Sequence, residues 1–352
     1  MIKIIKQMYY TETNNSCGNS RNYFIDNLKF LLMILVVVGH FGLKLTYIDD
    51  IKYLLYFIYV FHMPCFIFVS GFLAKRMNAG GKLRADKILS IFWMYLIFKF
   101  GNVLIGYACQ EKVSLSLFKD ASAPWYLIAL CIWYLSIPLL ERIKTHYLIT
   151  GSFLVGLMAG YVSSFKDIFS LSRVFVFFPF FIIGFCLPEK KLEKVLGKRL
   201  RLPAVLLLTA LLGSFLIFGR SFTSVARIIY GTSPYSSSLG DLAPYGFFIR
   251  GLWYVLACAM SLAFILLVPR CKLFFSKYGE RTLQIYMTHI WCRNILIYIG
   301  FFSMIKSGPK YLSVLILLGS VALTFLLSNT LLKKLFDLFM ASGLFRKIVK
   351  NN

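Results

Sequence analysis

The chain has 352 residues, of which 59% are hydrophobic and 15% are charged, whereas soluble domains are about 45–50% apolar and about 25% charged. This composition excludes a soluble globular enzyme and a disordered chain. The net charge of +25 would indicate nucleic-acid binding in a soluble protein. Here the Lys and Arg residues are divided among many loops, so we expect no nucleic-acid partner and assign the excess charge to the cytoplasmic loops of a membrane protein.

Apolar runs of helical length recur along the chain and are separated by short polar segments. At about 20 residues per crossing of a bilayer, they predict ten transmembrane helices. The runs lie at residues 29–47, 53–74, 90–106, 124–140, 147–162, 174–187, 203–219, 246–268, 282–301 and 311–330. We therefore expect an all-α integral membrane protein, a bundle of about ten transmembrane helices in the lipid bilayer.

The basic residues between these runs orient the bundle. With the amino terminus inside, the inner segments hold 26 Lys and Arg residues and the outer segments hold 9, the direction expected for cytoplasmic loops. We predict cytoplasmic termini and a multi-pass protein of the plasma (inner) membrane. The predicted parts are a polar cytoplasmic segment at 1–20, a ten-helix membrane domain at 21–330 and a basic cytoplasmic tail at 331–352. The longest outer loop, 220–245, is a candidate flexible lid or acceptor-side loop.

Several kinds of site lack their sequence signatures. The 8 cysteines form no Cys-x-x-Cys pair, so we expect neither a disulfide framework nor a bound metal. There is no Walker A loop, Gly-x-Ser-x-Gly elbow or His-Glu-x-x-His pair. These absences weaken the case for phosphotransfer, soluble-type ester hydrolysis and zinc-dependent hydrolysis.

Ionisable residues inside an apolar span are costly and therefore mark candidate functional positions. The first span, read as residues 21–40 together with the polar residues before the run, carries Asp26, Lys29 and His40. These three residues fall on one stripe of a helix at about 100° per residue. His40 lies about 21 Å further toward the outer side than Asp26. A lone histidine in a span is as often a structural group as a catalytic one, and Asp26 and Lys29 can serve simply as interface anchors.

The second run contains His62 and Pro64, which would bend or open the helix in its outer half. Ser70 and Gly71 further along would allow another helix to approach closely. A basic cluster follows at once, made of Lys75, Arg76, Lys82, Arg84 and Lys87. This cluster is either the positive-inside signal or a phosphate-binding site on the cytoplasmic face.

Later runs add further polar candidates. Trp125 opens the fourth run, where aromatic residues normally form the interfacial belt, and Arg173 at the edge of the sixth run is by itself typical of a snorkelling arginine. His289 and Arg293 lie four residues apart on one face of the ninth run. Two ionisable groups in one span indicate a polar interior or a water-filled cavity.

Two of these segments resemble acyltransferase family 3, a family of integral-membrane enzymes. RNYFIDNLKFLLMILVVVGH (21–40) resembles the first-helix signature of that family, an Arg, then Asp-x-Leu-Lys/Arg, then a His that ends an aliphatic run. FHMPCFIFVSGFLAKR (61–76) resembles its second helix. Arg84 and Lys87 lie where the family often has Arg-x-x-Arg, and Lys87 keeps the charge but loses the planar guanidinium.

Three more segments extend the resemblance to most of the chain. PWYL (124–127) and IYMTH (285–289) match the family, and SRVFVFFPFFIIGF (172–185) is similar to its fucose 4-O-acetylase-like branch. Each motif is weak alone, but five in the right order on a ten-span topology are strong together. The resemblance covers residues 21–330.

The resemblance implies an O-acyltransferase that moves an acetyl group from cytoplasmic acetyl-CoA, or another acyl group from acyl-CoA, to a hydroxyl of a cell-surface glycan or lipid-linked sugar. His40 would be the general base. His62 would be a second acid or base, or an acceptor contact. Asp26 matches the family position and would shape the inner mouth of the site. At about 21 Å from His40, it is too far away to touch that residue.

The resemblance also implies where the substrates bind. CoA phosphates would bind basic residues at the inner face, namely Lys29, Lys75, Arg76, Lys82, Arg84 and Lys87. A narrow polar seam would carry the pantetheine arm of CoA toward His40. Trp125, Arg173 and His289 would contact the acceptor.

Two alternatives stay open at this point. A secondary transporter or flippase for a sugar or glycan would suit a ten-span bundle with interior histidines, although no repeated halves or paired broken helices are visible. A different class of membrane O-acyltransferase would also use a histidine within the membrane. The position of His40 at the end of the first span, after Arg and Asp-x-Leu-Lys, favours family 3.

Overall fold

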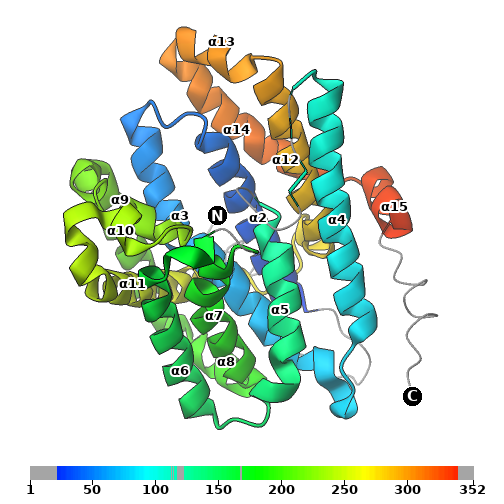
Figure 1. Cartoon of the computed structure of the whole chain (residues 1–352), viewed down its shortest axis with the longest axis vertical. Coiled ribbons are helices and arrows are strands. Elements are labelled where there is room, and N and C mark those ends of the chain that lie inside the picture. The colour runs from blue at the N-terminus through cyan, green and yellow to red at the C-terminus, as the bar shows by residue number, and fades with distance from the viewer. Residues whose placement is uncertain (1–21, 112, 114, 117–122, 167–168, 340–352) are drawn as a thin grey trace.

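The computed structural model describes residues 22–111, 113, 115–116, 123–166 and 169–339, which form helices, turns and loops and no strand. The longer helices are α2 (Tyr23–Gly42), α3 (Asp49–Ala74), α4 (Ala85–Ala108), α5 (Trp125–Leu140), α6 (Thr145–Met158), α7 (Leu171–Cys186), α9 (Arg201–Phe222), α11 (Gly246–Leu267), α12 (Thr282–Tyr298) and α14 (Lys310–Leu327). The expected all-α fold is confirmed for this part of the chain (Figure 1).

Short helical segments connect the long helices. They are η1 (Lys75–Gly81), η2 (Ala159–Tyr161), η3 (Ser163–Lys166), α8 (Glu189–Val195), η4 (Lys198–Leu200), η5 (Ala226–Tyr230), α10 (Tyr235–Leu239), η6 (Gly240–Tyr245), η7 (Ser276–Arg281), α13 (Phe301–Ser307) and α15 (Thr330–Phe339). The predicted segment at 1–20 and the end of the predicted tail, from residue 340 onward, lie outside the described residues. The tail predicted at 331–352 begins within α15.

Each predicted apolar run falls on one of the longer helices. Within the described residues, six stretches are long and apolar enough to cross a membrane, namely α2, Asp49–Asn78, α4, α9, Tyr235–Leu267 and α14. By contrast, α5, α6, α7 and α12 have 14 to 17 residues, or about 21–26 Å at 1.5 Å per residue. These lengths fall short of the about 30 Å hydrocarbon core, so a count of ten crossings stays a prediction.

The first helix begins earlier than hydropathy alone predicts. It starts at Tyr23 because the Asn22 side chain accepts a hydrogen bond from the Ile25 main-chain nitrogen at 3.2 Å and so caps the helix. Asp26 and Lys29 in the next turns form an ion pair at 3.2 Å. These polar side chains interrupt the apolar run without interrupting the helix.

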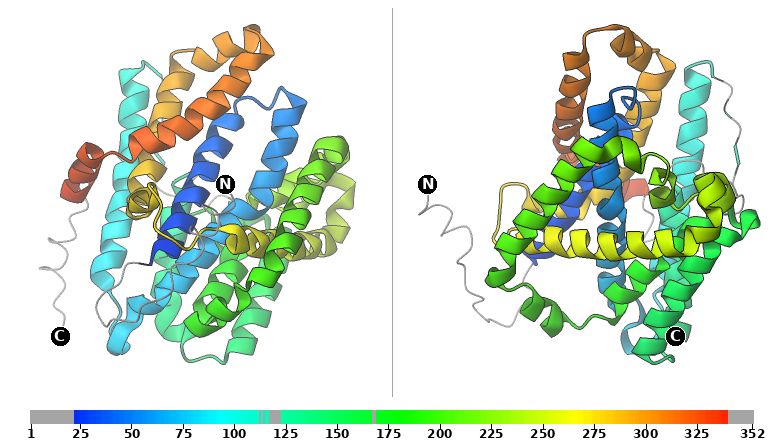
Figure 2. Two further views of the ribbon diagram at one scale, coloured as in Figure 1. Left: turned by 180° about the vertical axis from the view of Figure 1, so that it is seen from behind. Right: turned by 90° about the vertical axis from the view of Figure 1, so that its left-hand side faces the viewer.

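The helices α2 and α3 form the centre of the bundle, and α4, α9 and α14 lie on its flanks (Figure 2). Most of α2 and α3 is buried, whereas only a third or less of each flanking helix is buried. Their outward surfaces carry large apolar side chains such as Leu104, Leu206 and Leu318. An exposed surface of this kind fits a lipid environment.

Hydrogen bonds join helix ends that are predicted to lie on the same side of the membrane. We call the ends near residues 74–90, 141–147, 188–203 and 269–281 the inner ends, after the predicted topology, and the opposite ends the outer ends. The bonds among inner segments run from Lys75 to the Leu187 carbonyl, from Asn78 to Glu141, from Asn27 to the Pro269 carbonyl and from Arg270 to the Leu196 carbonyl.

Outer segments contact one another in the same way. The Tyr47 hydroxyl pairs with Ser313 at 2.7 Å, and the Tyr161 hydroxyl donates to the Pro244 carbonyl at 3.2 Å. These contacts match the predicted alternation of the loops between two sides. Which side faces the cytoplasm stays a prediction from charge.

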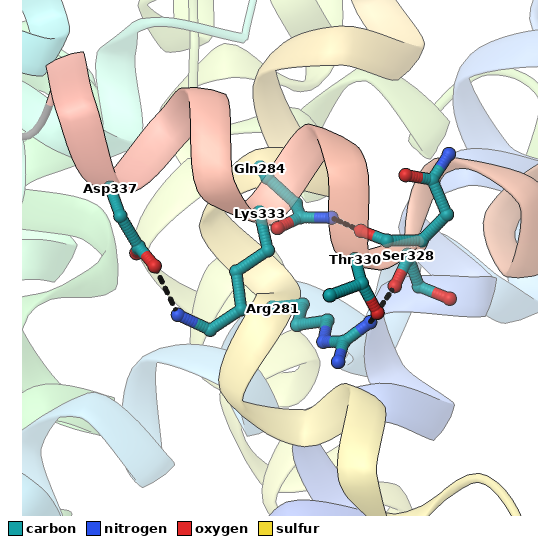
Figure 3. Close-up of polar contacts among 7 residues, drawn as sticks. Arg281, Gln284, Ser328, Thr330, Lys333 and Asp337 are labelled. Atoms are coloured by element: carbon teal, nitrogen blue, oxygen red, sulfur yellow. Dashed lines mark hydrogen bonds and ion pairs between the residues drawn. The ribbon is translucent and has the colours of Figure 1, made fainter.

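The end of α14 is held by the start of α12, as Figure 3 shows. Arg281 donates to the Ser328 carbonyl at 2.5 Å, and Gln284 donates to the Leu327 and Asn329 carbonyls at 2.8 and 3.2 Å. These carbonyls have no partner within α14 because they lie at its carboxyl end. The side chains of α12 therefore fix the inner end of α14 and the origin of α15.

The closest helix contact joins α3 to α7 and depends on two glycines. A Cβ atom built on Gly71 would lie 2.0 Å from the Phe181 carbonyl oxygen, and one built on Gly184 would lie 2.0 Å from the Phe68 carbonyl oxygen. Because both obstacles are main-chain atoms, no side-chain rotation can relieve them. The close approach expected at Gly71 is confirmed, and Gly184 completes it from the other helix.

Replacing Gly184 by Ala is therefore expected to force α3 and α7 apart and to destabilise the protein by about 1–3 kcal/mol or more. The measurement is the thermal unfolding midpoint of the purified protein in detergent. Gly213→Ala in α9 is the matched control, because no described atom beyond its chain neighbours and its own helix backbone lies within 4 Å of the added Cβ. Equal midpoints for the two variants would show that the crossing is not tightly constrained.

Candidate active site

A cavity of about 150 Å³ lies within the bundle, walled by α2, α3, α5, α7 and α12 and by the end of η5. Its larger polar side chains include His40 of α2, Tyr59 and His62 of α3, Trp125 of α5, Arg173 of α7 and Arg293 of α12. The structure thus brings together four residues that the sequence singles out separately: His40, His62, Trp125 and Arg173. We call this space the polar cavity.

His40 occupies the last turn of α2 and is held from α12. The Arg293 Nη1 atom donates to His40 Nδ1 at 3.4 Å. Arg293 is fixed in turn, because its Nη2 atom donates to Asn294 Oδ1 at 2.9 Å and Asn294 donates to Asn102 Oδ1 at 3.1 Å. A chain of hydrogen bonds therefore links α4 through α12 to the ring of His40.

His289 lies behind His40 and does not line the polar cavity. The two rings are 5.2 Å apart at 44°. The His289 side chain is fully buried, and its Nδ1 atom bonds to the Ile285 carbonyl at 2.8 Å. The structure therefore places this expected acceptor contact one side chain away from the cavity.

His62 lies on α3 and faces the polar cavity. Its Nδ1 atom bonds to the Ile58 carbonyl at 2.8 Å, which fixes the ring against its own helix. Tyr59, one turn earlier, meets this ring edge-on at 4.7 Å. Although Pro64 follows closely, α3 continues without a break from Asp49 to Ala74. The helix therefore does not open at this point, and the alternative expectation, a bend, stays a prediction.

Trp125 and Arg173 form one unit in the cavity wall. The Arg173 guanidinium lies 5.1 Å above the Trp125 ring, in a cation–π contact. On α7, Phe177 stacks on the same indole at 5.3 Å. Trp125 is therefore buried in the bundle, and Arg173 lines the cavity beside it.

A second cavity of about 200 Å³ adjoins the polar cavity on its inner side. The two share Val36, Met63 and Tyr286 in their walls. The second cavity extends one turn inward along α2 to Met33 and one turn inward along α3 to Phe66. Its lining is mostly aliphatic and aromatic, so we call it the apolar cavity. The polar seam expected for the pantetheine arm stays a prediction.

The inner basic residues lie apart from both cavities. Lys75 is bonded to the Leu187 carbonyl, and Arg76 lies 3.9 Å from Glu189 in an exposed pair. Arg84 pairs with Asp86 at 3.0 Å.

The side chains of Lys82 and Lys87 are exposed. The structure therefore places the cluster of five basic residues at the inner ends of α3 and α4. The Asp26–Lys29 pair occupies the inner end of α2.

Sequence reasoning missed the tyrosines of the site. Tyr59, Tyr230 and Tyr286 all line the polar cavity. The Tyr59 hydroxyl is buried and has no hydrogen-bond partner among the described residues. The three-residue spacing of Tyr59 and His62 on one helical face was the available signal. Arg293 was noticed in the sequence but given no role.

The chemistry of the lining residues restricts the cavity to certain ligands. Among the described residues that line it, none is Asp or Glu, and two carry guanidinium groups. No group of three His, Cys, Asp or Glu side chains suited to a metal ion occurs in the described part of the chain. The cavity therefore offers imidazoles and cations to an anionic or polar molecule.

These features define a polytopic helical membrane protein with a buried polar site between its helices. A family model described as an acyltransferase domain matches residues 22–332. The chain therefore belongs to acyltransferase family 3, as the sequence motifs predict, and it is an acyltransferase. No curated protein and no solved structure matches it. Membership of this family sets the transporter alternative aside.

Proposed function

We propose that this enzyme transfers an acetyl group from cytoplasmic acetyl-CoA to a hydroxyl of a cell-surface glycan or lipid-linked sugar, in the plasma membrane. The observation that carries the proposal is the meeting of His40 and His62 with Arg173 and Trp125 in one buried cavity. The similarity of segment 172–185 to the fucose 4-O-acetylase-like branch supports a sugar acceptor.

The cavity supplies the groups that acyl transfer needs. One imidazole takes the proton of the acceptor hydroxyl as its oxygen attacks the thioester carbonyl carbon. The carbon–sulfur bond breaks, and the CoA thiolate leaves with a proton. Negative charge develops on the acyl oxygen, and the cationic wall formed by Arg173 and Arg293 stabilises that charge in a site without a lining carboxylate among the described residues.

The apolar cavity supports entry of the donor from the inner side. It leads from Met33 toward His40, which lies seven residues or about 10 Å further along α2. A flexible pantetheine arm with a small acyl group fits a passage lined by apolar side chains better than charged phosphates do. The phosphates would stay at the inner face, near Lys29 and the basic residues from Lys75 to Lys87.

The acceptor would enter from the outer side. Trp125 and Arg173 offer an aromatic ring and a cation to a sugar, and Tyr230 from the end of η5 lines the same space. The segment that follows, through α10 and η6, belongs to the predicted lid at 220–245. A sugar on a lipid carrier or a growing polysaccharide is presented at this face.

Replacing both His40 and His62 by Ala is expected to lower acetyl transfer by at least about a hundredfold, because the general base is lost. The measurement is CoA release and acetylated product in proteoliposomes that receive acetyl-CoA and a panel of methyl glycosides. His146→Ala is the matched control, since His146 is exposed on α6. A double variant as active as the control would place the chemistry elsewhere.

Neutralising residues of the basic cluster is expected to weaken binding of the donor, acetyl-CoA, and to leave binding of the acceptor unchanged. If Arg84 and Lys87 hold CoA phosphates, Arg84→Gln and Lys87→Gln each lose a charge-assisted contact of about 1.5–3 kcal/mol. The KM for acetyl-CoA should rise about tenfold or more, and the KM for the acceptor should change little. Lys310→Gln on the predicted outer side is the control. An unchanged acetyl-CoA KM would leave the cluster as a topology signal only.

A further inference from the structure

The partner of His40 fixes which of its nitrogens carries the proton. A guanidinium has donors and no acceptor, so the Arg293 Nη1 atom donates to His40 Nδ1 at 3.4 Å. The Nδ1 atom must then present its lone pair, and in the neutral ring the proton lies on Nε2. The orientation of the Arg293 guanidinium is restrained, because its Nη2 atom donates to Asn294, which in turn donates to Asn102. His40 therefore offers a bound molecule an N–H donor.

His62 has the opposite arrangement. A carbonyl oxygen can only accept, so the Nδ1 atom of His62 donates its proton to the Ile58 carbonyl at 2.8 Å. The lone pair of the neutral ring then lies on Nε2. Because His62 lines the polar cavity, this nitrogen is the one available to a molecule bound there.

His289 shows that this arrangement alone does not make a base. Its Nδ1 atom bonds to the Ile285 carbonyl at 2.8 Å, as His62 bonds to Ile58. Its Nε2 atom is buried without a hydrogen-bond partner among the described residues, and the residue does not line the cavity. Of these two histidines, which both bond a main-chain carbonyl through Nδ1, only His62 lines the cavity.

We infer that His62 is the general base and that His40, oriented by Arg293, is the hydrogen-bond donor to the acyl oxygen. This inference rests on the proposed function and assigns different roles to the two histidines from those implied by the family resemblance, in which His40 is the base. It makes Arg293 a positioning residue that acts through His40.

The step balances with the groups at hand. The acceptor hydroxyl gives its proton to His62 Nε2 while its oxygen forms a bond to the carbonyl carbon. The electron pair of the carbonyl moves to the acyl oxygen, which accepts a hydrogen bond from His40 Nε2–H. When the carbonyl re-forms, the carbon–sulfur bond breaks, and the CoA thiolate takes the proton from the imidazolium of His62.

Side-chain amides distinguish the two roles, because each resembles one nitrogen of the ring. In His40→Gln the amide N–H can replace the Nε2–H donor, whereas His40→Ala has no donor. In His62→Asn an N–H near the Nδ1 position can keep the bond to the Ile58 carbonyl, and in His62→Gln an amide reaches the Nε2 position. Neither amide can take a proton at neutral pH.

The experiment measures acetyl transfer from acetyl-CoA to the methyl glycoside panel, with thermal midpoints and acetyl-CoA binding as checks of folding. We expect His40→Gln to retain activity within about tenfold of wild type, and His40→Ala to fall about a hundredfold or more. His62→Asn and His62→Gln should both fall at least about a hundredfold. His146→Gln, at an exposed position on α6, is the matched histidine control.

Two results overturn the assignment while leaving the proposed function intact. One is a folded His62→Asn or His62→Gln variant that keeps most of the wild-type rate. The other is a His40→Gln variant as inactive as His40→Ala. If the wild-type protein leaves acetyl-CoA intact with every methyl glycoside, the proposed function fails first, and the assignment fails with it.

Discussion

Main-chain contact between α3 and α7 sets the geometry on which the site depends. Gly71 and Gly184 let the two helices touch where any Cβ would collide with a carbonyl oxygen. The same two helices carry His62 and Arg173 in their outer halves, where the polar cavity opens between them. A wider crossing would separate a base on one helix from a cation on the other. The close packing at Gly71 and Gly184, near the inner ends of α3 and α7, thus sets the distance between His62 and Arg173 nearer the outer side.

A second constraint is electrostatic. Polar groups inside a bilayer need partners, and a charged group there is costly. The polar cavity meets this requirement without a lining carboxylate among the described residues: Arg293 pairs with His40 and Asn294, and Arg173 rests on the Trp125 ring. Such a site stays positive when empty. It is therefore suited to a reaction in which negative charge develops on a bound molecule.

Much of the architecture could be predicted from the sequence, because the helices are read from apolar runs and the loops from charge. His40, His62, Trp125 and Arg173 could be named because polar side chains in apolar runs are conspicuous. Their assignment to one active site came from the family motifs and not from helical periodicity. Tyr59 and Tyr286 do not stand out as polar residues within apolar runs, since tyrosines are frequent in this chain. The pairing of Arg293 with His40 joins residues 253 positions apart, which no local pattern encodes.

The most direct test of this account is a structure, determined by electron cryo-microscopy, with a non-hydrolysable acetyl-CoA analogue bound. The account places the acyl carbonyl in the polar cavity, within hydrogen-bond reach of His40 Nε2, with the pantetheine arm in the apolar cavity and the phosphates at the inner ends of α3 and α4. Analogue density that reaches the bundle from the outer side, or that leaves the polar cavity empty, would contradict it.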